Sequence, residues 1–206
     1  AGWVHILDLM KLALEDAGYD VFMPRVDPAN IDRTCTVSQE ASWDLMAADQ
    51  LPMDADLFLG PPGYSLAQIM RLKASPKQIG NTARIATYVW NNADWWRDKM
   101  LAEEFAGFNA RYDLSPAWRW INRRALELSD LVIACSPWVK ATHAKIVPEE
   151  RIRTVFWGVD SQRFQSRPIP ISSTLRVLFM GSDPVRKGLI YLLNAMEPLE
   201  RILLTI

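Results

Sequence analysis

Two adjacent cations, Arg186 and Lys187, are the residues whose position best suits chemistry. They follow an apolar run at 175–180 that ends at Gly181, and they open a helical pattern at 187–196. A glycine lets a ligand approach the backbone, and a helix N-terminus attracts anions. The segment therefore suits a negatively charged group such as a phosphate. The alternative interpretation is a solvated helix start.

Two other short motifs have a chemical and a structural interpretation. Asp54 and Asp56 have the DxD form that holds a divalent ion on a diphosphate, but aspartates before a strand commonly form turns, which we favour. Residues 60–64 (GPPGY) follow an apolar run, at the strand end where open α/β sheets bind ligands. This loop is either part of an acceptor pocket or a rigid surface turn.

Five of the nine tryptophans lie between Trp90 and Trp120, interleaved with arginines and acidic residues. Such a mixture occurs in packed cores, in sugar or membrane contacts, and in single-strand nucleic-acid binding. Because the local charge is mixed, we rank core packing first, acceptor or membrane contact second, and nucleic acid last.

Composition narrows the class of protein. The chain has 206 residues, is 50% hydrophobic and carries a net charge of −1, so it is globular and lacks the positive excess of a nucleic-acid binder.

The cysteines, Cys35 and Cys135, form no CxxC pair, and the histidines are His5 and His143, so we expect no metal site. We interpret Cys135 as a small buried hydrophobe and His143 as a surface or satisfied histidine. No apolar run of about 20 residues and no leader is visible, so we expect a cytoplasmic protein, with a peripheral membrane contact allowed.

The pattern of elements predicts an α/β fold, a doubly wound parallel Rossmann-like sheet followed by a truncated second domain of the same kind. Apolar runs without alternation indicate strands covered on both faces, and helices between them indicate a parallel sheet. We expect Leu57, Ile85, Leu131 and Val155 on neighbouring inner strands. Helices are expected at 5–17, 94–108, 116–128, 137–145 and 187–196, and strands at 21–23, 57–59, 84–90, 131–134, 152–157, 175–180 and 202–206.

The chain is expected to contain one domain and part of another. Residues 1–165 form the first domain, and 166–173 form a linker with two prolines and three serines. Residues 174–206 form one βαβ unit, too small for a closed domain. The chain opens on a helix instead of a central strand. We therefore predict that the first strand is missing and that both ends are truncated.

Six short motifs, in a fixed order, carry a resemblance to a known family. They are 129–136 (SDLVIACS), 147–152 (VPEERI), 158–160 (GVD), 163–164 (RF), 178–181 (LFMG) and 186–189 (RKGL). Together they resemble the retaining, "group 1" glycosyltransferases of family 4, which have the GT-B fold of two Rossmann-like domains. The resemblance implies transfer of a sugar from a nucleotide-sugar donor to a sugar, lipid or other acceptor. It also implies a nucleotide sugar as co-substrate, no cofactor and no metal.

The resemblance assigns roles in the second domain to four residues. Lys187 contacts the donor diphosphate, and Arg186 acts with it as the catalytic pair, because the departing diphosphate gains negative charge. Gly181, Ser182 and Lys187 form the donor-binding turn. The donor contacts that lie beyond 206 in the family imply that the 206 residues alone are inactive.

In the first domain the resemblance assigns acceptor binding to Gly2, Trp90 and Asn91. Trp90 and Asn91 stand where the family has a catalytic histidine, and Ser182 stands where it has an arginine. These departures keep two alternatives open: a sugar-nucleotide epimerase of the same fold, and a non-catalytic glycosyltransferase-like binding module.

Overall fold

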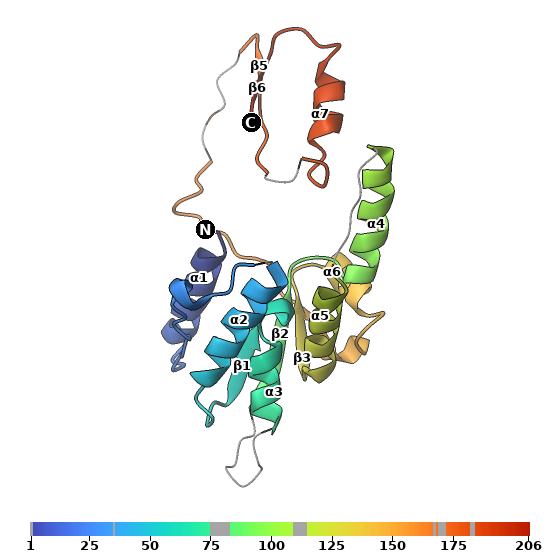
Figure 1. The fold of residues 1–206 in the computed structure, drawn as a ribbon. Coiled ribbons are helices and arrows are strands. Elements are labelled where there is room, and N and C mark those ends of the chain that lie inside the picture. The colour runs from blue at the N-terminus through green and yellow to red at the C-terminus, as the bar shows by residue number, and fades with distance from the viewer. Residues whose placement is uncertain are drawn as a thin grey trace. The chain divides into compact units, whose positions relative to one another are not determined.

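The computed structural model describes residues 2–34, 36–74, 83–108, 115–166, 168, 172–181 and 184–206, with the backbone alone for 2–7 and 36. The chain is a mixed α/β protein (Figure 1). It divides into two compact units, each described here by itself. The first unit comprises Ala1–Asn91 and Ser115–Val155, and the second comprises Asn92–Leu114 and Phe156–Ile206.

The first unit is built on a four-stranded parallel sheet. Its strands are β1 (Leu57–Gly60), β2 (Arg84–Val89), β3 (Leu131–Ala134) and β4 (Ile152–Thr154), and they lie in this order. The parallel sheet confirms the prediction from the apolar runs. β1 lies at the edge, however, and its first residue, Leu57, is exposed instead of inner.

Helices connect these strands and precede them. They are α1 (Gly2–Asp16), η1 (Pro28–Asn30), α2 (Thr36–Asp49), η2 (Pro62–Tyr64), α3 (Leu66–Ala74), α5 (Pro116–Leu128), α6 (Pro137–His143) and η4 (Glu149–Arg151). The helices expected at 5–17, 116–128 and 137–145 are confirmed with small shifts of their ends. α2 and α3 were not predicted.

β2 lies at the centre of the packing. Its residues Ile85 to Val89 are all buried, and because successive side chains point to opposite faces, the strand is covered on both. α5 packs near it. Ala125 is fully buried in one cluster with Ile85, while Leu126 belongs to a second cluster with Val89.

The strand expected at 21–23 does not form. The backbone of the following Arg25 is satisfied by a side chain, because its N–H donates to Oε1 of Gln50 and its carbonyl accepts from Nε2 of Gln50, both at 3.0 Å. Among the described residues no strand pairs with this segment, and a lone strand is not stable. The prediction was therefore wrong.

The strand expected at 152–157 is shorter than predicted. The N–H of Val155 still donates to the carbonyl of Ala134 at 2.9 Å, but the chain then leaves the sheet and Val155 to Trp157 are exposed. Val155 therefore lies just beyond the sheet instead of on an inner strand.

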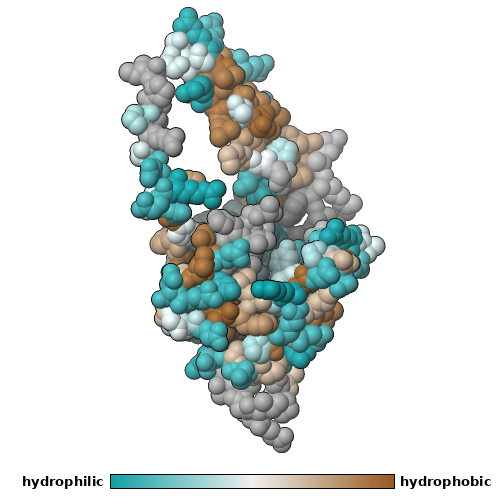
Figure 2. Space-filling view, turned by 90° about the vertical axis from the view of Figure 1, so that its left-hand side faces the viewer, coloured by the Kyte–Doolittle hydropathy of each residue, from teal (hydrophilic) through white to brown (hydrophobic). Residues whose placement is uncertain are grey.

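The second unit contains α4 (Asp94–Gly107) and a βαβ arrangement of β5 (Leu175–Leu178), α7 (Leu189–Met196) and β6 (Ile202–Thr205). β5 and β6 pair in parallel, as the sequence predicts. The surface of this βαβ arrangement carries exposed apolar side chains, visible as brown in the upper part of Figure 2. These include Leu175, Leu178, Leu193, Leu199 and Leu203.

Within the described ranges no helix combines the length and the apolar character needed to cross a membrane. The predicted linker at 166–173 falls partly outside the described residues. Its boundaries stay a prediction.

Candidate functional site

Gly181 and Lys187 are in close contact in the second unit. A Cβ atom on Gly181 would stand 3.0 Å from Cγ and 3.4 Å from Cβ of Lys187. The aliphatic stem of Lys187 thus packs against the backbone just after β5, where any larger residue would crowd it. The structure therefore places together two of the residues that the motif assigns to donor binding.

The turn that carries Lys187 ends at Gly188. Gly188 is in the left-handed region, with φ of 75°, and it caps the start of α7. Its N–H donates to the carbonyl of Val185 at 3.0 Å, and the N–H of Leu189 donates to that of Pro184 at 2.8 Å. Because this conformation interrupts the helix, α7 starts at Leu189 and not at 187 as predicted. Arg186 and Lys187 are in the turn before its first residue.

The charge at this turn is exposed. The side chains of Arg186 and Lys187 are both solvent-accessible. Within the described part of the chain, no hydrogen bond or ion pair engages the ammonium of Lys187. Ser182, the third residue assigned here, lies outside the described residues. The exposed ammonium of Lys187 thus lies beside the N-terminus of α7. A cation next to a helix N-terminus is suited to binding an anion.

The residues assigned to acceptor binding lie in two elements of the first unit. Gly2 is the first residue of α1, whereas Trp90 and Asn91 follow β2 at its carboxyl end. The carbonyl of Trp90 accepts a hydrogen bond from the Cys135 thiol at 3.5 Å, and its ring centroid lies 5.1 Å from that of Tyr88. Trp90 is thus half-buried, and Asn91 is exposed beside it.

The loop at 60–64 is a packed turn at the same edge of the sheet. Pro62 and Gly63 are buried within η2. The ring of Tyr64 meets those of Trp43 and Trp118 edge-on, with centroids 6.4 and 5.8 Å apart. The loop is therefore a packed turn and not a surface turn, and a part in an acceptor pocket stays a prediction. Trp118 packs against Gly63 and Tyr64 but is only partly buried, and Trp95 and Trp120 are exposed, so core packing does not describe the whole tryptophan-rich stretch.

Sequence reasoning missed two buried carboxyl groups on α2, Glu40 and Asp44. Burial raises the pKa of both, against the hydrogen bonds that they accept. Glu40 Oε1 accepts from the hydroxyl of Tyr64 at 2.7 Å, and burial together with this carboxyl raises the pKa of Tyr64. Glu40 lies in the first half of α2, next to η2, and so belongs to the carboxyl edge of the sheet. The apolar pattern gave no signal for it, because α2 shows little apolar periodicity.

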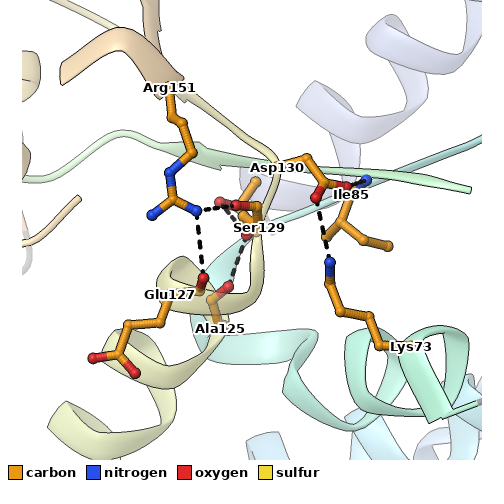
Figure 3. A network of polar contacts seen from close by, with 8 residues as sticks. Lys73, Ile85, Ala125, Glu127, Ser129, Asp130 and Arg151 are labelled. Atoms are coloured by element: carbon orange, nitrogen blue, oxygen red, sulfur yellow. Dashed lines mark hydrogen bonds and ion pairs between the residues drawn. The ribbon is translucent and has the colours of Figure 1, made fainter. Parts of the chain in front are cut away.

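A polar network around Asp130 lies at the amino ends of the strands, opposite the carboxyl ends that carry Trp90 and η2 (Figure 3). One oxygen of Asp130 accepts the N–H of Ile85 at 2.8 Å, and the other pairs with the ammonium of Lys73 at 3.3 Å. Asp130 precedes β3, so it ties the amino end of this strand to β2 and α3.

Ser129 and Arg151 complete this network. The hydroxyl of Ser129 donates to the carbonyl of Ala125 at 2.7 Å and lies 3.1 Å from that of Thr87. The guanidinium of Arg151 donates to the carbonyl of Ser129 at 2.8 Å (Figure 3). Ser129, Asp130 and Arg151, which belong to the motifs 129–136 and 147–152, therefore hold elements together at the amino ends of the strands.

No group of three or more His, Cys, Asp or Glu side chains gathers for a metal ion among the residues that the structure describes. Asp54 lies in a turn before β1, and the carbonyl of Asp56 accepts the N–H of Arg84 at 2.8 Å. Both carboxylates are exposed. His143 is buried, and its Nδ1 donates to the carbonyl of Val139 at 2.9 Å, so it is the satisfied histidine that we expected.

No protein-family model matches this chain, and no curated protein sequence matches it. The resemblance to group 1 glycosyltransferases consequently depends on sequence motifs.

Proposed function

We propose that this chain belongs to a metal-independent, retaining glycosyltransferase of the GT-B kind. Its first unit would hold the acceptor, and its second unit would begin the domain that holds the nucleotide-sugar donor. The observation that carries the proposal is the contact between Gly181 and Lys187, in the turn between a parallel strand and α7. The parallel sheet of the first unit and the order of the motifs support it.

The proposed chemistry needs fixed positive charge. Transfer breaks the bond between the anomeric carbon and the diphosphate. The acceptor oxygen forms the new bond, and its proton passes to the departing diphosphate. Negative charge develops on the departing diphosphate, and a cation held in place lowers the barrier. Lys187 would supply this charge, with its stem fixed against Gly181, and Arg186 would stand beside it.

The acceptor would bind at the carboxyl edge of the first unit's sheet. Open parallel sheets bind ligands outside the carboxyl ends of their strands. Trp90 offers a half-buried aromatic ring there, and Asn91 offers an exposed amide. An aromatic face and an amide are suited to the CH groups and the hydroxyls of a sugar.

The test uses the longest natural chain that contains these residues, with UDP-, GDP- and ADP-sugars. Lys187→Ala is expected to lower kcat/KM about 100-fold, as loss of one charge-stabilising group does. Lys145→Ala, an exposed lysine in the first unit, is the matched control and should keep full activity. Equal activity of both variants would remove Lys187 from the site.

Two further results of this assay bear on the class of reaction. Activity should persist in EDTA, and activity that is lost and then restored by manganese would contradict the metal-independent mechanism. Conversion of the nucleotide sugar without any acceptor would indicate an epimerase instead. If no nucleotide sugar is consumed, the transferase proposal fails.

A further inference from the structure

Glu40 and Asp44 are a matched pair of carboxyl groups with different surroundings. Both face inward from α2, one turn apart, and only 7% and 4% of their surfaces are exposed. Asp44 accepts three hydrogen bonds from the start of α3: from the N–H of Ala67 at 2.7 Å, from the N–H of Gln68 at 3.3 Å and from its side-chain amide at 2.9 Å. Asp44 thus has a complete structural role as a cap of α3.

Glu40 has no such complete role. Its Oε1 accepts from Tyr64, but its Oε2 is buried and has no hydrogen-bond partner among the described residues. Nearly all buried polar atoms in native proteins are paired, because an unpaired one costs about 1–3 kcal/mol. We infer from this cost that Oε2 of Glu40 accepts a hydrogen bond from a bound ligand.

The position of Glu40 indicates where that partner binds. Its carboxyl contacts η2, which follows β1 at the carboxyl edge of the sheet. Three aromatic rings surround this contact, and those of Trp43, Tyr64 and Trp118 are all partly exposed. The aromatic cluster beside Glu40 therefore reaches the protein surface.

We propose that Glu40 is a specificity-determining residue for a carbohydrate acceptor, whose hydroxyl group donates a hydrogen bond to Oε2. The identity of this ligand rests on the proposed function. Tyr64 fixes the orientation of the carboxyl through Oε1, and the indoles of Trp43 and Trp118 offer apolar surface to the CH groups of a sugar ring.

The chemistry of the group also restricts the ligand. In its ionised form this carboxyl group repels a phosphate or a carboxylate, because like charges within a few ångströms of each other in a buried site are strongly unfavourable. The part of the acceptor that reaches Glu40 is therefore neutral and bears hydroxyls. Anionic groups of the substrate bind elsewhere.

The test measures saturation-transfer NMR on the full chain without any nucleotide sugar. The probes are the methyl α- and β-pyranosides of glucose, galactose and mannose. At least one glycoside should bind the natural chain. Glu40→Gln should weaken this binding at least about tenfold, because its amide donates where Oε2 accepts. The control is Asp49→Asn, an exposed carboxylate on the same helix, which should bind the glycoside normally.

Thermal unfolding separates this role from a structural one. Glu40→Gln should keep its Tm within a few degrees of the natural chain, because the altered atom has no partner within the fold. Asp44→Asn should lower the Tm clearly, since it disturbs the cap of α3. A large loss of Tm in Glu40→Gln would overturn the inference, because it would show that Oε2 serves the fold.

The outcomes for the two proposals can be told apart. If no glycoside of the panel binds, or if Glu40→Gln binds as the natural chain does, the inference about Glu40 is overturned, whatever the transferase assay gives. If a glycoside binds through Glu40 but no nucleotide sugar is consumed, the site stands and the proposed function fails. Sugar transfer with an unchanged acceptor KM in Glu40→Gln would support the function and overturn the inference.

Discussion

The indole of Trp118 lies over Gly63 so closely that its Cη2 atom is 2.1 Å from the place where a Cβ would stand. This contact joins α5 to η2, although the two residues are far apart in the sequence. A real Cβ does not approach a ring carbon to this distance. Glycine at 63 is therefore required by packing, and the carboxyl edge of β1 depends on it.

Gly63→Ala is expected to destabilise the chain by about 1–3 kcal/mol, because the indole of Trp118 must move from its packed position. Urea unfolding measures this loss. Gly107→Ala is the control, since nothing lies within 4 Å of its added Cβ and the change should be neutral or slightly stabilising. Combining Gly63→Ala with Trp118→Leu should cost less than the sum of the two. Strict additivity would show that the indole is not the obstacle.

Asp130→Ala is expected to cost about 1–3 kcal/mol of unfolding free energy, because the N–H of Ile85 loses its carboxylate partner. Lys73→Ala removes only the exposed ion pair of the same carboxylate, and should cost less than about 1 kcal/mol. Chemical denaturation of the two variants makes the comparison. Equal losses would show that Asp130 acts mainly through the lysine.

Gly181→Ala is expected to change ligand binding more than stability. The added Cβ meets Cγ of Lys187 at 3.0 Å, and a flexible side chain shifts at a cost below about 1 kcal/mol. The ammonium would then leave its position, and binding of UDP, GDP or ADP, followed by calorimetry, should weaken. Gly158→Ala, with open space around it, is the control. Unchanged affinity in Gly181→Ala would separate the glycine from the anion site.

The sequence predicted elements whose side chains are mainly apolar. The continuous apolar runs of β1, β2 and β3 are of this kind. α2 was missed because its buried face includes Glu40 and Asp44, and carboxyl side chains do not predict burial in a core. Their partners, Tyr64 and Gln68, are at least 24 positions away, so only the folded chain shows the pairing.

The errors also have physical causes in distant contacts. Residues 21–23 have the composition of a strand, but no described strand pairs with them. The side chain of Gln50 instead makes two hydrogen bonds with the backbone of Arg25, just after this segment. In the second unit, Gly181 and Lys187 are in contact, and their role in donor binding stays a prediction. The start of α7 was placed too early because the left-handed conformation of Gly188 cannot be read from its type alone.

His143 gives the chain a predictable dependence on pH. Burial lowers the pKa of His143 below its ordinary value of 6.5, while its hydrogen bond to the carbonyl of Val139 opposes this. The folded chain therefore resists protonation at this imidazole, whereas the unfolded chain takes up the proton near pH 6.5. As pH falls below this value, the unfolded state binds more protons and the folded state loses stability, by at most about 1.4 kcal/mol per pH unit.

His143→Asn is expected to remove this loss, because its amide can still donate to the carbonyl of Val139 but does not titrate. Urea unfolding at pH 8 and pH 5 measures the loss of stability in both chains, and the loss should be smaller in the variant. Burial raises the pKa values of Glu40 and Asp44, so these two groups have the opposite effect. They lower the stability of the folded chain as pH rises above their ordinary pKa values near 4. They are present in both chains, so the difference between the chains isolates the imidazole. An equal loss in both chains would mean that His143 is protonated while folded, which its burial argues against.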